Sequence, residues 1–107
     1  MLQQQPRQGT LVIGPFSTIE DVDEAGCALL GYSKDELVGL HGSELIPREH
    51  RPSVAVALDR IRRSDLALPT PGFIMRKDGS VLSIELTARK LPYNRLAFGL
   101  RPTSAAS

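Results

Sequence analysis

The one cysteine and the two histidines of this sequence are the first candidates for nucleophilic attack, metal binding or proton transfer: Cys27, His41 and His50. A thiol becomes reactive beside cationic groups. The stretch AGCALL around Cys27 offers none, so we interpret this residue as a small apolar part of the core. His41 lies next to a glycine and His50 lies just before a long helical segment, and both positions indicate solvated loop histidines.

Three carboxylates, Asp21, Asp23 and Glu24, cluster where a helix is expected to begin. Negative charge stabilises the N-terminus of a helix, so this cluster needs no catalytic role. The sequence has no serine–histidine–aspartate triad around a nucleophile elbow and no phosphate-binding loop. It also has no paired cysteine or histidine ligands and no GxGxxG stretch. We therefore expect neither an enzyme nor a metal-binding protein.

Short helices with clearly marked ends lie in the first half of the chain. Asp23 is the expected N-cap of a first helix, EAGCALL, and Gly31 supplies the left-handed residue that ends it. Ser33 and Glu36 form the Ser-x-x-Glu of a capping box, and Gly39 ends the second helix after about one turn. The stretch LLGYSKDELVG thus predicts two short helices joined by a tight corner.

A third short helical turn is expected within 42–50, with Ser43 as its cap and Pro47 closing it. Residues 51–65 then predict the one long helix, with Pro52 in its first turn. The apolar face of this helix repeats at the helical period through Val54, Leu58 and Ile61. Its outer face and its last turn are expected to carry Arg60, Arg62 and Arg63.

Strands are expected on both sides of the helices, at 10–16 and 17–23 before them and at 72–91 and 95–100 after them. The segment 72–91 is a hairpin of two strands around the turn KDGS. Its second strand alternates apolar and polar residues, so one face is apolar and the other is solvated. Strands, then helices, then strands predict an α+β fold, with an antiparallel sheet and its helices on one face.

Three stretches in this order resemble the PAS family of domains: DVDEAGCALLGYSKDELVG, LIP before the long helix, and MRKDGSVLSIEL. The resemblance covers residues 10–101, which leaves 1–9 as a flexible lead-in and 102–107 as a flexible tail. It implies a five-stranded antiparallel sheet in the order 2-1-5-4-3, with short helices and one longer helix on one face around an apolar pocket. It also implies a sensory or regulatory role in signal transduction.

The resemblance also indicates which cofactors to test for. Haem-binding relatives carry a histidine on the long helix, and the corresponding helix here, PSVAVALDRIRR, has none. Flavin-binding relatives carry a cysteine within an Asn-Cys-Arg-Phe-Leu-Gln stretch, and this chain has no such stretch. We therefore expect no haem, no flavin and no other bound cofactor.

The pocket between the long helix and the sheet is the candidate functional site. Its expected walls are apolar side chains of the long helix, the sheet and one short turn: Leu45, Val54, Leu58, Ile61, Phe73, Met75, Ile84, Leu86, Phe98 and Leu100. Such side chains can fill an interior completely or leave room for a small apolar ligand. The sequence leaves both readings open, because they differ by the volume of a few methylene groups.

Two functions fit this pattern. We favour a sensory module, in which a small apolar ligand in the pocket alters the sheet or the long helix of a signalling protein. The alternative is a ligand-free module for protein–protein interaction or homodimerisation. In that case the outer face of the sheet would pair, with Val81 and Ile74 as an exposed patch.

The composition argues against several other partners. The chain has 107 residues, enough for one domain, and 13 basic against 12 acidic side chains give a net charge of +1. Such a balance attracts neither nucleic acid nor a membrane surface, and no apolar run is long enough to cross a membrane. A single cysteine allows no internal disulfide, so we expect a cytoplasmic protein.

Overall fold

The computed structural model describes residues 8–63 and 69–103. Five strands form one sheet: β1 (Gly9–Ile13), β2 (Ile19–Val22), β3 (Thr70–Met75), β4 (Val81–Leu91) and β5 (Arg95–Pro102). Their order across the sheet is β2-β1-β5-β4-β3 and each neighbouring pair is antiparallel, so the predicted order and fold class are confirmed. Most of the expected lead-in and tail, and the expected helix end at 64–65, lie outside the described residues.

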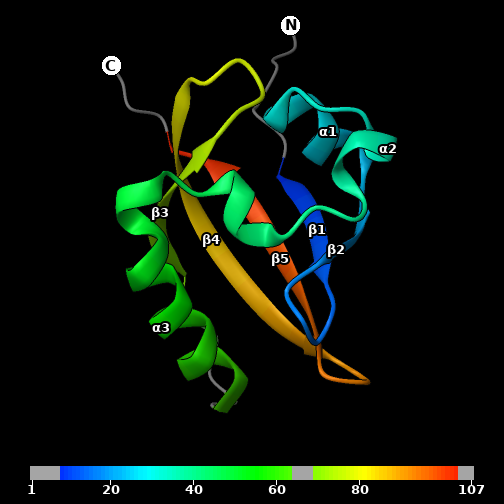
Figure 1. Ribbon diagram of the computed structural model, residues 1–107, viewed down its shortest axis with the longest axis vertical. Helices are drawn as coiled ribbons and strands as arrows, with labels where there is room; N and C mark the ends of the chain where they lie inside the picture. The colour runs from blue at the N-terminus through cyan, green and yellow to red at the C-terminus, as the bar shows by residue number, and fades with distance from the viewer. Residues whose placement is uncertain (1–7, 64–68, 104–107) are drawn as a thin grey trace, which may run out of the picture.

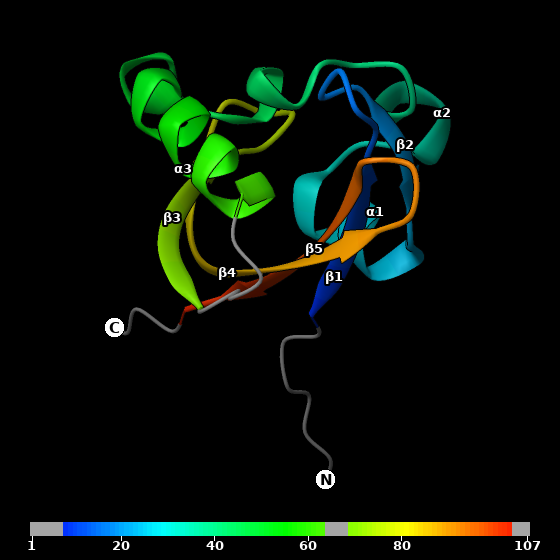
Figure 2. The same cartoon turned by 90° about the horizontal axis from the view of Figure 1, so that it is seen from below.

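Helices flank this sheet at two places. The described helical segments are α1 (Glu24–Leu30), α2 (Lys34–Leu37), the 3-10 turns η1 (Gly42–Leu45) and η2 (Arg48–His50), and α3 (Arg51–Arg63). The sheet curves like a trough, and α3 lies across its concave side over β3 and β4 (Figure 2). α1 and α2 lie towards the other edge, beside β1 and β2 (Figure 1).

The first helix begins and ends at the predicted residues. The Asp23 carboxylate accepts a hydrogen bond from the backbone N–H of Gly26 at 2.7 Å, which satisfies one of the unpaired donors of the first turn. The same oxygen accepts from the backbone N–H of Thr10 at 3.0 Å, so this cap also attaches α1 to β1. Gly31 ends the helix in the left-handed conformation at φ 82°.

The second helix carries both hydrogen bonds of the predicted capping box. The Ser33 hydroxyl accepts from the backbone N–H of Glu36 at 3.1 Å, and the Glu36 carboxylate accepts from that of Ser33 at 2.9 Å. The turn between β3 and β4 docks on the same corner. Lys77 donates its backbone N–H to the carbonyl oxygen of Leu30 at 3.0 Å, and its ammonium group lies 2.6 Å from the Glu36 carboxylate.

The cap of η1 differs from the prediction. The imidazole Nδ1 of His41, and not the Ser43 hydroxyl, accepts a hydrogen bond from a backbone N–H of the first turn, that of Ser43 at 3.2 Å. Ser43 is therefore inside the turn and His41 is the residue before it. The preference for a short hydroxyl at this position suggested Ser43, but an imidazole nitrogen can also accept this hydrogen bond.

The side chains of β3 that face the core also differ from the prediction. We expected Phe73 and Met75 on the core side of the sheet and Ile74 on its outer face. The structure pairs Ile74 with Leu82 and Met75 with Val81, so five residues, and not the four of KDGS, form the loop. A shift of one residue moves every side chain of a strand to the other face. Ile74 is therefore on the core side, 4% exposed, and cannot belong to an outer patch.

The packed core and the long helix differ in how well they are buried. The side chains with the least exposed surface come from the sheet, α1, α2 and η1: Ile19, Leu30, Leu37, Leu45, Leu96 and Leu100. No residue of α3 is fully buried, and Leu58 and Ile61 only pack partly against the core. The rest of the domain thus forms the tight core, and α3 covers it loosely.

Candidate ligand pocket

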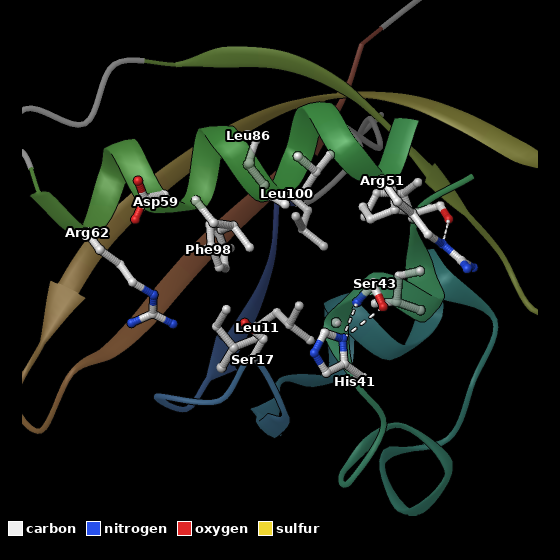
Figure 3. A pocket seen from close by; sticks show the side chains of 18 residues that line it. Leu11, Ser17, His41, Ser43, Arg51, Asp59, Arg62, Leu86, Phe98 and Leu100 are labelled. Atoms are coloured by element: carbon white, nitrogen blue, oxygen red, sulfur yellow. Dashed lines mark hydrogen bonds between the residues drawn. The ribbon is translucent and has the colours of Figure 1, made fainter. Parts of the chain in front are cut away.

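A cavity of about 320 Å³ lies between α3 and the sheet (Figure 3). Its roof is one face of the helix, where Val54, Ala55 and Leu58 turn towards the sheet at helical spacing. Because Ala55 is small and the helix stands off from the sheet, these side chains do not fill the space beneath them. This face of the helix therefore lies over an unfilled pocket that is partly open to solvent.

Four strands and one short turn supply the floor and the end wall. Their apolar lining residues are Leu11, Ile13, Leu45, Ile46, Ile74, Leu86, Phe98 and Leu100. Strand alternation explains why they converge: Leu11 pairs with Phe98, and Leu86 pairs with Leu100, so the members of each pair share a face of the sheet.

Six of the ten predicted wall residues line the cavity: Leu45, Val54, Leu58, Leu86, Phe98 and Leu100. Ile84 lies in the core at 2% exposure and Ile61 packs against the core, both outside the lining. Phe73 and Met75 have the opposite phase from Ile74 and also lie outside it. Phe73 is 45% exposed and stacks on His50 with ring centroids 5.1 Å apart.

Several lining residues were not predicted. Leu11 and Ile13 come from β1, and Ile74 occupies the place on β3 that we assigned to its neighbours. The alternation of Leu11 and Ile13 in TLVI was a usable signal, since the resemblance placed this strand beside the last one. The polar lining residues carried no such signal.

A small cluster of polar residues, Ser17, His41 and Ser43, lines one side of the pocket. Backbone contacts bring residues 17 and 41–42 together: Thr18 bridges to His41, and Gly42 donates its N–H to the carbonyl oxygen of Ser17 at 2.7 Å. His41 Nδ1 accepts the N–H of Ser43, and it lies 2.8 Å from the Ser43 hydroxyl oxygen.

Arg62 reaches across the end of the pocket nearest the C-terminus of α3. Its Nη1 donates to the backbone carbonyl oxygen of Asn94 at 2.8 Å and to the Asn94 side-chain oxygen at 3.2 Å. Its Nη2 donates to the carbonyl oxygen of Gly14 at 3.2 Å. The sequence predicted this arginine on the outer face of the helix. The structure instead has it half-buried, joining α3 to the β1–β2 loop and to the β4–β5 turn.

Two further charged residues line the cavity. Arg51, at the opposite end, donates through Nε to the carbonyl oxygen of Ile46 at 3.0 Å. Asp59 forms an ion pair with Arg63 one turn later, at 2.8 Å. Within residues 8–63 and 69–103, no group of three or more histidine, cysteine or acidic residues is placed to hold a metal ion. No helix in that part of the chain is long and apolar enough to cross a membrane.

Comparisons with known proteins identify the family. No family model matches the chain. The PAS domain of an HTR-like protein from Haloarcula marismortui is 25% identical with a TM-score of 0.76, over 90% of this chain and 81% of that one. A domain of a sensory box sensor histidine kinase/response regulator from Geobacter sulfurreducens is 25% identical with a TM-score of 0.75, over 88% and 82%.

This chain is a PAS domain. It is one of the sensory domains of signalling proteins, a class of modules that are generally not catalytic. A methyl sulfide methyltransferase-associated sensor from Methanosarcina acetivorans is 32% identical over 73 residues, which is 68% of this chain. The PAS domain spans only 7% of the length of that relative.

Proposed function

We propose that this PAS domain senses a small apolar ligand bound between α3 and the sheet. The observation that supports this function is the cavity of about 320 Å³, whose walls are mostly apolar and whose roof is a helix without a fully buried residue. Ligand pockets in proteins are hollows of this kind, with a few polar groups at defined places.

The loose roof explains how binding can become a signal. A ligand can shift a conformational equilibrium only by its different affinity for the two states. A molecule in this cavity contacts Leu58 on α3 and Phe98 on β5 together, so it favours the state in which α3 lies against the sheet. Movement of α3, or of the strands beneath it, is then the output of the domain.

The pocket suits a small molecule better than a large cofactor. At roughly 30 Å³ for each water-sized group, 320 Å³ holds a ligand of about ten heavy atoms. Haem and flavin are several times larger than such a ligand. In addition, α3 contains no histidine that could serve as an axial ligand of haem. We therefore propose that the domain works without either group.

Thermal unfolding with and without 1-octanol tests the function. Binding to the folded state raises the melting temperature by mass action, so we expect a gain for the native protein. Leu58→Trp fills the roof of the cavity and should abolish the gain. Val56→Trp, on the exposed side of the same helix, should retain it. An equal gain in Leu58→Trp would contradict binding at this site.

A second candidate function is pairing through the outer face of the sheet. Met75 and Val81 are direct partners on that face, and Val81 is 54% exposed. This pair replaces the predicted patch of Val81 with Ile74. Sedimentation of the native protein and of Val81→Glu tests it: a dimer that Val81→Glu dissociates supports pairing, and a monomeric native protein excludes homodimerisation by this face.

A further inference from the structure

Arg62 is a cation at the pocket whose hydrogen bonds all go to uncharged oxygens. Its three bonds are to the two oxygens of Asn94 and to the carbonyl oxygen of Gly14. A guanidinium group has five N–H donors, so two of them have no bond within the described part of the chain. No carboxylate there lies within ion-pair distance of Arg62.

The carboxylates around this end of the pocket are already paired with other arginines. Asp59 on α3 lies 2.8 Å from Arg63. Glu20 on β2, whose side chain lies against Gly14, is 3.8 Å from Arg95. Among the described residues, no carboxylate is therefore left to pair with Arg62, which lies at the edge of a mostly apolar cavity.

We propose that the ligand is a small amphipathic monocarboxylate, and that Arg62 binds its carboxylate while the apolar part lies under α3. This inference rests on the proposed function, since it specifies the ligand of the same pocket. A planar guanidinium with free donors matches the two oxygens of a carboxylate and makes charge-assisted hydrogen bonds to them. Leu58, Phe98 and the other apolar walls then enclose the hydrocarbon chain.

Arg51 does not provide an equivalent site. It lies three turns earlier on α3, about 16 Å away along the helix axis. Figure 3 shows its guanidinium turned away from the cavity, whereas Arg62 reaches across the end where Ser17 and Leu11 lie. The ligand is thus oriented, with its anionic end at Arg62.

Octanoate and 1-octanol separate the charged end from the apolar chain, because both carry eight carbons and differ in the head group. We would measure the affinity of both by calorimetry at pH 7.5, where octanoate is ionised. Because a looser α3 weakens both ligands alike, Arg62→Gln should weaken octanoate binding by about tenfold or more beyond its effect on 1-octanol binding. Arg60→Gln removes the same charge from an exposed position of the same helix and should change neither affinity.

Each result then decides between the two proposals. Octanoate affinity that falls no further than 1-octanol affinity in Arg62→Gln, with 1-octanol still bound, overturns the carboxylate site and leaves the apolar pocket standing. A native protein that binds neither molecule overturns both. If Arg62→Gln does not fold, Arg62→Lys is the second variant. It keeps the charge without the planar fork, so it should weaken octanoate alone by about threefold or more, and equal binding would contradict the inference.

Discussion

Arg62 donates a hydrogen bond through Nη1 to the backbone carbonyl oxygen of Asn94 at 2.8 Å, although 32 residues separate them in sequence. The bond joins the last turn of α3 to the turn between β4 and β5. Nη2 of the same side chain donates to Gly14, so one residue fixes the helix to two loops at the opposite edge of the pocket. Around it, α3 has only partly buried apolar contacts.

We expect Arg62→Gln to loosen α3 in the ligand-free protein. Loss of these hydrogen bonds should lower the free energy of unfolding by about 1–2 kcal/mol, measured by urea denaturation. Backbone amides of α3 should also exchange with deuterium faster than in the native protein, while the exchange rates of the β5 amides should change much less. Arg60→Gln is the control and should stay within about 0.5 kcal/mol. Equal exchange of α3 in both variants would contradict this role of Arg62.

Gly9→Ala should destabilise the domain although it replaces a strand glycine. A Cβ atom at Gly9 would lie 2.7 Å from the Cα of Gly26, so the backbones of β1 and α1 would have to move apart. We expect a loss of about 1–3 kcal/mol in urea denaturation, as for other overpacked sites.

Gly72→Ala is the matched control for this prediction, since it is also a strand glycine. Among the described residues, no atom lies within 4 Å of a Cβ at that position, and its φ is not positive. The change should be neutral, or stabilising by up to about 1 kcal/mol through the unfolded chain. If both alanine variants behave alike, the close approach of β1 and α1 is wrong.

Glu36 should make the domain sensitive to acid. The hydrogen bond from Lys77, and then that from the Ser33 backbone, lowers the pKa of the Glu36 carboxyl. A lowered pKa in the folded state means that the stabilisation is complete above the ordinary glutamate value of about 4.3 and is lost as the pH falls through the folded value. The melting temperature of the native protein should therefore exceed that of Glu36→Gln at pH 7, and this difference should shrink towards pH 3.

Glu49→Gln is the control for the pH experiment. It removes an exposed carboxyl of η2 that has no hydrogen bond or ion pair within the described residues. Its melting temperature should follow that of the native protein across the same pH range. A difference between the native protein and Glu36→Gln that stays constant from pH 7 to pH 3 would show that the contact with Lys77 does not act through charge.

Local signals allowed much of the fold to be predicted. Asp23, Gly31 and the pair Ser33–Glu36 each act through hydrogen bonds or a backbone conformation within a few residues, and each is present as predicted. The phase of β3 was harder, because Phe73, Ile74 and Met75 are all apolar and no polar residue marks the outer face. The length of the loop between β3 and β4 sets which side chains of β3 face the core. The loop is one residue longer than predicted, so the two faces of β3 were exchanged in the prediction.

The candidate site depended on information that the sequence does not contain. Whether Leu58 and Phe98 touch or enclose a space is a matter of where the whole helix lies. Arg62 follows the apolar stripe of α3 by one position and looked like a solvent-exposed arginine. Only the arrangement of the Gly14 and Asn94 loops makes it part of the pocket.

Because α3 contributes so little to the tight core, substitutions of its pocket-facing apolar residues should change the free energy of unfolding only a little. Val54, Ala55 and Leu58 can be exchanged for larger or smaller side chains while Leu30, Leu37 and Leu100 continue to hold the domain together. Substitutions on one helical surface can therefore change the size and shape of the pocket with little loss of stability.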